Sequence, residues 1–151
     1  MNGTSIKNLI LVVVSAIGGF LVEFMGGADS ILKALVIFMA VDYITGLVVA
    51  FVFHKSRKTE GGGASSKEGL KGIVKKLCML MLVGVAHSLD AVMGADYLRA
   101  TLIMFFLANE GLSILENIGL MGVKYPAFLV RALEALRDNS DGEDEHKDES
   151  S

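Results

Sequence analysis

The feature that most constrains this chain is the length of its apolar runs. Four runs of 17 to 23 residues, at 9–25, 31–53, 77–93 and 98–118, carry few charges. A helix needs about 20 apolar residues to cross the hydrocarbon core of a bilayer. Strands are not expected, because the runs are too long for them and an open sheet leaves backbone groups unpaired in lipid. The sequence therefore predicts an all-α integral membrane bundle with about four transmembrane helices.

The charged residues are concentrated between and after these runs. The loop 54–76 holds seven of the 14 Lys and Arg residues: Lys55, Arg57, Lys58, Lys67, Lys71, Lys75 and Lys76. The short connections 26–30 and 94–97 hold none. Short basic loops stay in the cytoplasm. We therefore expect a cytoplasmic 54–76 loop that contacts anionic headgroups, and both termini in the cytoplasm.

The C-terminal region differs in character from the four runs. Residues 126–137 place apolar side chains at helical spacing and begin with the only proline, Pro126, which suits a first helical turn. This pattern predicts a short amphipathic helix that lies on the membrane or packs on a partner. Residues 138–151 hold seven of the 17 acidic residues, and we expect a disordered tail there. The membrane domain then comprises residues 1–137.

Polar residues inside the predicted spans are the main functional candidates, because polar groups in lipid need partners or water. Asp42 stands near the middle of the second span, with Thr45 three residues on. It either faces a pore or partner helix, or bonds to a neighbouring side chain and fixes packing. The second half of the fourth span carries a polar stripe of five residues at steps of three, four and seven: Asn109, Glu110, Ser113, Glu116 and Asn117.

The polar stripe allows two arrangements. In one, several subunits turn it toward a common lumen. In the other, it is buried between helices or surfaces at the cytoplasmic interface. The stripe lies toward the cytoplasmic end of its span, which favours the second arrangement for the resting protein.

Small residues mark possible contact faces between helices. Ser15 and Gly19 in the first span, and Gly84 and Ser88 in the third, follow the small-x-x-x-small pattern. Such pairs let helix backbones approach closely in lipid. The pattern supports association within or between subunits, and self-assembly into a homo-oligomer is the partner interaction we expect.

The sequence offers no constellation typical of an enzyme. The three histidines and single cysteine lack zinc-site spacing, and the glycine-rich segment 61–63 lacks the Lys-Ser/Thr of a phosphate-binding loop. We therefore expect no enzymatic activity, no cofactor and no metal. The basic loop lies between two spans, so headgroups rather than nucleic acid are its expected partners.

Several short segments together resemble the phage lysis and toxin-secretion holins of the family-four type. These segments are Asp-Tyr-Ile-Thr-Gly at 42–46, Ser-Lys-Glu-Gly-Leu-Lys-Gly at 66–72 followed by Lys75 and Lys76, and Ala-Asn-Glu-Gly-Leu-Ser-Ile-Leu-Glu-Asn at 108–117. Gly119, Gly122 and Pro126 follow, so the resemblance covers about residues 35–130. The acidic tail and the long Gly/Ser linker depart from the family's usual pattern.

The resemblance implies a protein that oligomerises in the bacterial cytoplasmic membrane and opens lesions at a set time. An endolysin or a large toxin would leave the cell through them. A non-lytic membrane subunit, such as an antiholin, a channel or a transporter component, is the alternative. The polar stripe with Asp42 would stay mutually buried at rest and turn toward water when subunits rearrange.

Overall fold

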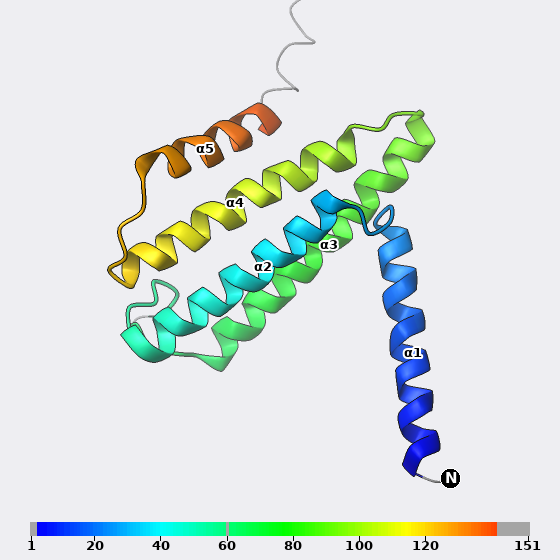
Figure 1. Cartoon of the computed structure of the whole chain (residues 1–151), viewed down its shortest axis with the longest axis horizontal. Helices are drawn as coiled ribbons and strands as arrows, with labels where there is room; N and C mark the ends of the chain where they lie inside the picture. Colours follow the sequence, from blue (N-terminus) through cyan, green and yellow to red (C-terminus); the bar gives the residue numbers. More distant parts are fainter. Residues whose placement is uncertain (1–2, 60, 142–151) are drawn as a thin grey trace, which may run out of the picture.

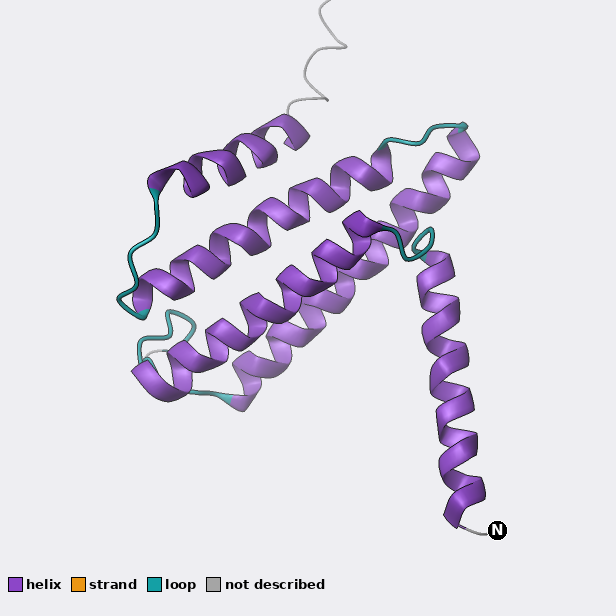
Figure 2. Cartoon of the chain, viewed as in Figure 1, coloured by secondary structure: helices purple, strands orange, loops and turns teal. Residues whose placement is uncertain are grey.

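The chain is a set of helices joined by short turns and one longer loop, as the computed structural model shows (Figures 1 and 2). Residues 3–59 and 61–141 are described, and this part contains no strand. The helices are α1 (Gly3–Phe24), α2 (Ser30–Val48), the π-helical η1 (Val49–Phe53), α3 (Ser66–Met93), α4 (Leu98–Leu120) and α5 (Ala127–Asp141). Four of these segments are long and apolar enough to span a membrane, which confirms the predicted all-α membrane architecture with an additional C-terminal helix.

Helix α4 is the centre of the bundle. It packs against α2, α3 and α5, and Figure 1 shows α2 and α5 on opposite sides of it. Four of the five buried positions on α3, Met79, Val83, Ala86 and Asp90, fall at alternating steps of four and three, and Gly84 is the fifth. This heptad spacing keeps one seam of a helix against its neighbour. Because lipid tails are as apolar as the core, close packing rather than a hydrophobic drive holds such helices together.

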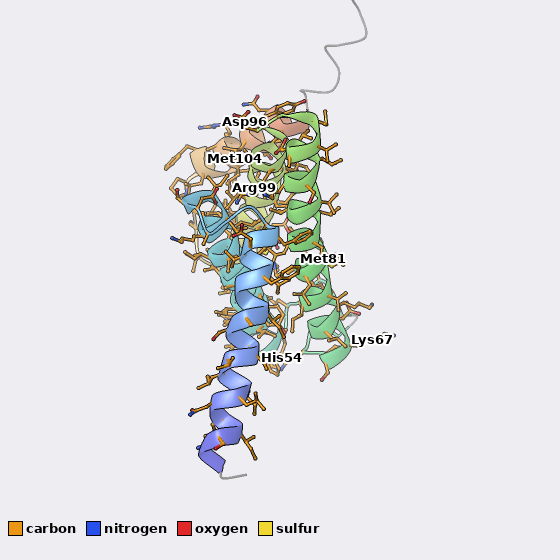
Figure 3. All side chains as sticks on the ribbon, turned by 90° about the vertical axis from the view of Figure 1, so that its right-hand side faces the viewer. His54, Lys67, Met81, Asp96, Arg99 and Met104 are labelled. Atoms are coloured by element: carbon orange, nitrogen blue, oxygen red, sulfur yellow. The ribbon has the colours of Figure 1, made fainter. Side chains whose placement is uncertain are left out.

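The bundle has two distinct ends. We call the end formed by the turns 25–29 and 94–97 the turn end, and the end carrying residues 54–65 the loop end. Figure 3 shows Asp96 and Arg99 at the turn end and His54 and Lys67 at the loop end. The largest fully buried apolar side chains include Leu35 and Ile103.

Local chemistry sets the turns at the turn end. Gly26 and Gly27 follow α1 with φ of +87° and +91°, a left-handed conformation that glycine adopts without a side-chain penalty. Asp29 then caps α2 by accepting a hydrogen bond from the Leu32 amide at 3.0 Å. Gly94, with φ of +66°, ends α3 in the same left-handed way.

Helix α1 stands away from the other helices, as Figure 1 shows. None of its membrane-spanning window is buried within the chain. Its last turn contacts α3, where the Phe24 ring lies so close to Gly84 that an added Cβ would be 1.9 Å from it. The whole length of α1 before this contact is therefore open to lipid or to another subunit.

The helical segments extend beyond the predicted bounds in several places. Helix α1 begins at Gly3, and α5 continues to Asp141, so the first residues of the predicted disordered tail are helical, whereas 142–151 lie outside the described residues. Helix α3 begins at Ser66, well before the apolar run that starts at residue 77, so the basic segment before that run is helical. Glu68 and Lys71 form an ion pair of 2.7 Å on its exposed side. The second span ends in the five π-helical residues of η1, after which His54 adopts a left-handed conformation.

Candidate functional site

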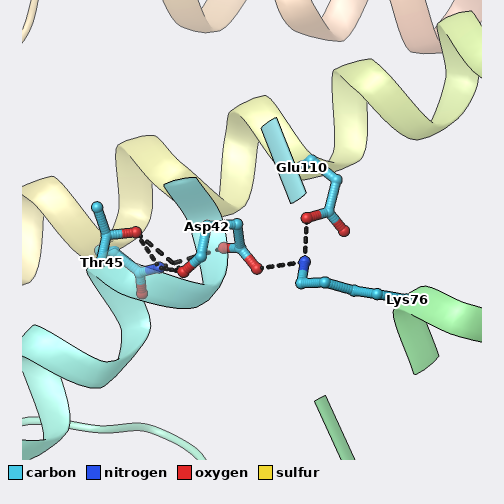
Figure 4. A network of polar contacts seen from close by, with 5 residues as sticks. Asp42, Thr45, Lys76 and Glu110 are labelled. Atoms are coloured by element: carbon cyan, nitrogen blue, oxygen red, sulfur yellow. Dashed lines mark hydrogen bonds and ion pairs between the residues drawn. The ribbon is translucent and has the colours of Figure 1, made fainter. Parts of the chain in front are cut away.

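A buried charge cluster joins the three packed helices. Asp42 of α2 and Glu110 of α4 both accept hydrogen bonds from the ammonium of Lys76 of α3 (Figure 4). The Lys76 Nζ lies 2.9 Å from Asp42 Oδ2. Side-chain exposure is 8% for each carboxylate and 16% for the lysine. We call Asp42, Lys76 and Glu110 the ion triad.

An amide extends the ion triad toward the loop end. Asn117 of α4 donates from Nδ2 to Asp42 Oδ1 at 3.2 Å and to Thr45 Oγ1 at 3.0 Å. The Thr45 hydroxyl in turn donates to the Asp42 carbonyl at 3.0 Å. Each carboxylate oxygen of Asp42 thus has a partner. No buried side-chain nitrogen or oxygen in residues 3–59 and 61–141 lacks a hydrogen bond.

The ion triad lies deep within the spans. Asp42 is 12 residues after Ser30 and 11 before Phe53, and Glu110 is 12 after Leu98 and 10 before Leu120. At 1.5 Å per helical residue, each carboxylate is at least about 15 Å from either end of its span. Charged groups at such depth are expensive in lipid and occur paired or beside water.

The charges of the ion triad do not balance. Two carboxylates share one ammonium, so the fully ionised cluster carries one net negative charge. Removing one partner of a buried ion pair costs about 3–5 kcal/mol, because the remaining charge is left unpaired. Lys76 is therefore the residue that holds α2, α3 and α4 together, because its loss leaves both carboxylates buried without a cation.

Lys76 has a different place from the one its sequence context suggested. Sequence reasoning grouped it with the headgroup-contact residues, yet its ammonium lies inside the bundle. The helix period accounts for this. Lys76 precedes Met79 and Val83 at the same three- and four-residue steps as the buried seam of α3. The other basic candidates of the loop are exposed: Lys55, Arg57, Lys58, Lys67, Lys71 and Lys75.

The five residues of the predicted polar stripe separate onto two lines of α4. Glu110 and Asn117, seven residues apart, both face the buried cluster: Glu110 accepts from Lys76 and Asn117 donates to Asp42. At about 100° per residue, the other three members lie roughly 40–120° away from these two. Glu116 is exposed, with its side chain 3.9 Å from Arg57. Asn109 and Ser113 are half-buried.

The small-residue candidates have unequal surroundings. Gly84 receives the Phe24 ring, and the Ser88 hydroxyl bonds to the Gly84 carbonyl at 2.9 Å. In α1, nothing lies within 4 Å of a Cβ placed on Gly19, and Ser15 is exposed. The pair in α3 therefore serves a contact within the chain, whereas the pair in α1 has none there.

A second polar cluster at the turn end was not anticipated from sequence. Asp90, which is buried, accepts hydrogen bonds from the Leu98 and Arg99 amides and so caps α4. The Arg99 guanidinium donates to the Gly27 carbonyl and to Asp29 Oδ2, the latter at 2.6 Å. The hydrogen bond from Arg99 holds the pKa of Asp29 below its usual value. This cluster ties both tight turns together and is structural.

The described residues contain no group of three His, Cys, Asp or Glu side chains arranged to hold a metal ion. The polar chemistry on view consists of hydrogen bonds and ion pairs between helices. Helices of membrane-spanning length around a buried ionic cluster define a small multi-pass helical membrane protein.

Comparison with known proteins specifies the family. The chain belongs to the bacteriophage holin family, whose model matches residues 19–138. It is 42% identical over 133 residues to the uncharacterized protein Lmo0128 of Listeria monocytogenes, covering 87% of this chain and 86% of the relative. It is 30% identical over 127 residues to a probable holin of Bacillus phage phi105, covering 83% and 88% respectively. No solved structure matches.

Proposed function

We propose that this chain is a holin that accumulates in the bacterial cytoplasmic membrane, associates with copies of itself, and opens lesions. Through these an endolysin, or a toxin, leaves the cell. Family membership and the probable phage holin among its relatives support this function. The observation that carries it is the ion triad. Its net charge at mid-span is more stable in contact with water than inside the closed bundle, which favours separation of the helices.

The proposed orientation follows from the exposed basic residues at the loop end. Positive charge in short loops stays cytoplasmic. The loop end then faces the cytoplasm with the N-terminus, and the turn end faces outward. Four crossings return the chain to the cytoplasm at the end of α4, so the N-terminus and the end of α4 are proposed to be cytoplasmic, and α5 then runs back beside α4 toward the turn end.

The proposed mechanism uses the ion triad as a clamp. In the resting subunit, Lys76 holds Asp42 and Glu110 on neighbouring helices and the polar groups are satisfied inside the bundle. At high density in the membrane, contacts between subunits compete with contacts inside them. The helices then separate at the triad, and its three charged groups meet water instead of one another.

The test compares two glutamates of α4. Glu110→Leu removes one carboxylate and leaves a balanced pair between Lys76 and Asp42, so the closed subunit has no surplus charge. Glu116→Leu, the matched control, changes an exposed residue six positions away. After induction in a bacterium that also makes an endolysin, wild type and Glu116→Leu should abruptly lose membrane potential and viability. Glu110→Leu should reach the membrane in equal amount and fail to lyse.

Two results would count against the proposal. Equal lysis by Glu110→Leu and wild type at matched accumulation would remove the ion triad from the mechanism. A wild-type chain that accumulates without ever depolarising the membrane would instead be a non-lytic subunit, such as an antiholin, a channel or a transporter component.

A further inference from the structure

Helix α5 and the residues just before it lie antiparallel beside α4. At its middle, the Leu133 methyl groups cover Gly111, where an added Cβ would lie 2.9 Å from both of them. At one end the Tyr125 ring lies beside Gly119. At the other end Leu136, Asn139 and Ser140 line a shared cavity with Ala100, Thr101 and Met104. Figure 1 shows α5 running back beside α4 toward the turn end.

This position puts α5 at membrane depth. Gly111 follows Glu110 of the ion triad directly, and α4 is about 34 Å long at 1.5 Å per residue. That length matches the roughly 30 Å hydrocarbon core. Leu133 therefore lies near the middle of the bilayer when α4 crosses it. Of the two sequence-based alternatives for this helix, the structure has it packed on a partner, and the partner is α4.

The outward face of α5 is charged. Arg131, Glu134 and Asp138 are exposed and fall at three- and four-residue steps, so they share one side of the helix. Arg137 pairs with Asp138 at 3.5 Å. Arg131 and Glu134 are each within about 3 Å of Leu133 along the helix axis, and so also near mid-bilayer. Hydrocarbon cannot surround such a face at this depth.

We infer that α5 lines the aqueous passage of the assembled lesion, with Arg131, Glu134 and Asp138 facing the water and Leu133 facing α4. This inference rests on the proposed holin function. This face carries one positive and two negative side chains, and charged groups at this depth need water or a partner around them. The apolar α4 side keeps the helix attached to the bundle while subunits rearrange.

The test places single cysteines on α5 after Cys78→Ser has removed the exposed native thiol. Glu134→Cys probes the charged face and Leu133→Cys, the adjacent residue, probes the face on Gly111. The full-length protein is reconstituted in liposomes loaded with a dye, at densities below and above the onset of leakage. A charged, membrane-impermeant methanethiosulfonate reagent is then added outside.

Above the leakage threshold, Glu134→Cys should react roughly tenfold faster or more than Leu133→Cys, and its modification should change the leak rate. Equal protection of both thiols in leaking liposomes would overturn the inference and leave the holin function intact. Fast reaction of Glu134→Cys below the threshold would also overturn it, by placing α5 on the membrane surface. Absence of leakage from the unsubstituted protein would instead refute the proposed function.

Discussion

Replacing Lys76 with methionine should make lysis premature. Methionine keeps a flexible chain of similar length but leaves Asp42 and Glu110 buried without their shared cation. A buried charge that loses its partner costs about 3–5 kcal/mol. Since about 1.4 kcal/mol is a factor of ten, even the lower figure shifts the ratio of closed to open subunits by roughly two orders of magnitude. The threshold density for opening should fall accordingly.

The matched control is Lys75→Met, which alters the exposed neighbour on the same helix. Both variants are induced at equal rates, membrane accumulation is followed by immunoblot, and membrane potential by a voltage-sensitive dye. Lys76→Met should depolarise cells earlier and at lower accumulation than wild type, and Lys75→Met at the wild-type time. Neutralising the whole ion triad, with Asp42→Asn and Glu110→Gln added, should remove the early onset.

If Lys76→Met and Lys75→Met depolarise cells at the same accumulated level, the clamp argument is refuted. The clamp argument is also refuted if Lys76→Met delays lysis, since two buried carboxylates without a cation cannot stabilise the closed bundle.

Two further predictions concern the turn end. Because the pKa of Asp29 is lower in the folded protein, its contact with Arg99 stabilises the fold at pH values above the unfolded pKa, near 3.9. This stability is lost as the pH falls through the lower folded pKa. Thermal unfolding in detergent, followed against pH, should lose this acid dependence in Arg99→Gln. Gly84→Ala should loosen α1, because the new methyl would meet the Phe24 ring, whereas Gly18→Ala, with nothing within 4 Å, should not; crosslinking between α1 and α3 measures the difference.

The membrane architecture was predictable because lipid imposes a simple rule on sequence. A span must be long and apolar, and the four runs are both. Hydropathy therefore predicted the end of the second span, at residue 53, and the start of α4, at residue 98, to within a few residues. Hydropathy alone does not mark the start of α3, because Ser66 and the basic residues after it are helical yet not apolar, and hydropathy reports only the part of a helix that meets lipid.

The candidate site was predicted in part. Asp42, Thr45, Glu110 and Asn117 were named from sequence and are brought together in the structure. Their common partner, Lys76, was assigned to the surface because it ends a basic segment. Lys76 lies three and seven residues before the buried Met79 and Val83, and this helical spacing is the signal that distinguishes it from the exposed Lys75.

The cluster around Arg99 could not be read from sequence in the same way. Its partners are backbone carbonyls and a turn carboxylate some 70 residues earlier, and nothing periodic links them. Asp90 lies near the end of α3, where a solvated side chain would be ordinary, but it is buried because it caps the next helix. Such contacts depend on how two turns meet in space.

The isolation of α1 has a consequence for how the chain divides into working parts. A span that no neighbouring helix covers has to be apolar enough to cross the bilayer, but its side chains need not fit another surface of the chain. Before Phe24, the sequence of α1 is therefore constrained by hydropathy and not by packing. The stretch shared with the family begins at residue 19, near the end of this helix, and continues through α5. The family model therefore covers all the helices that pack together, whereas most of α1 lies outside it and is unburied in the fold.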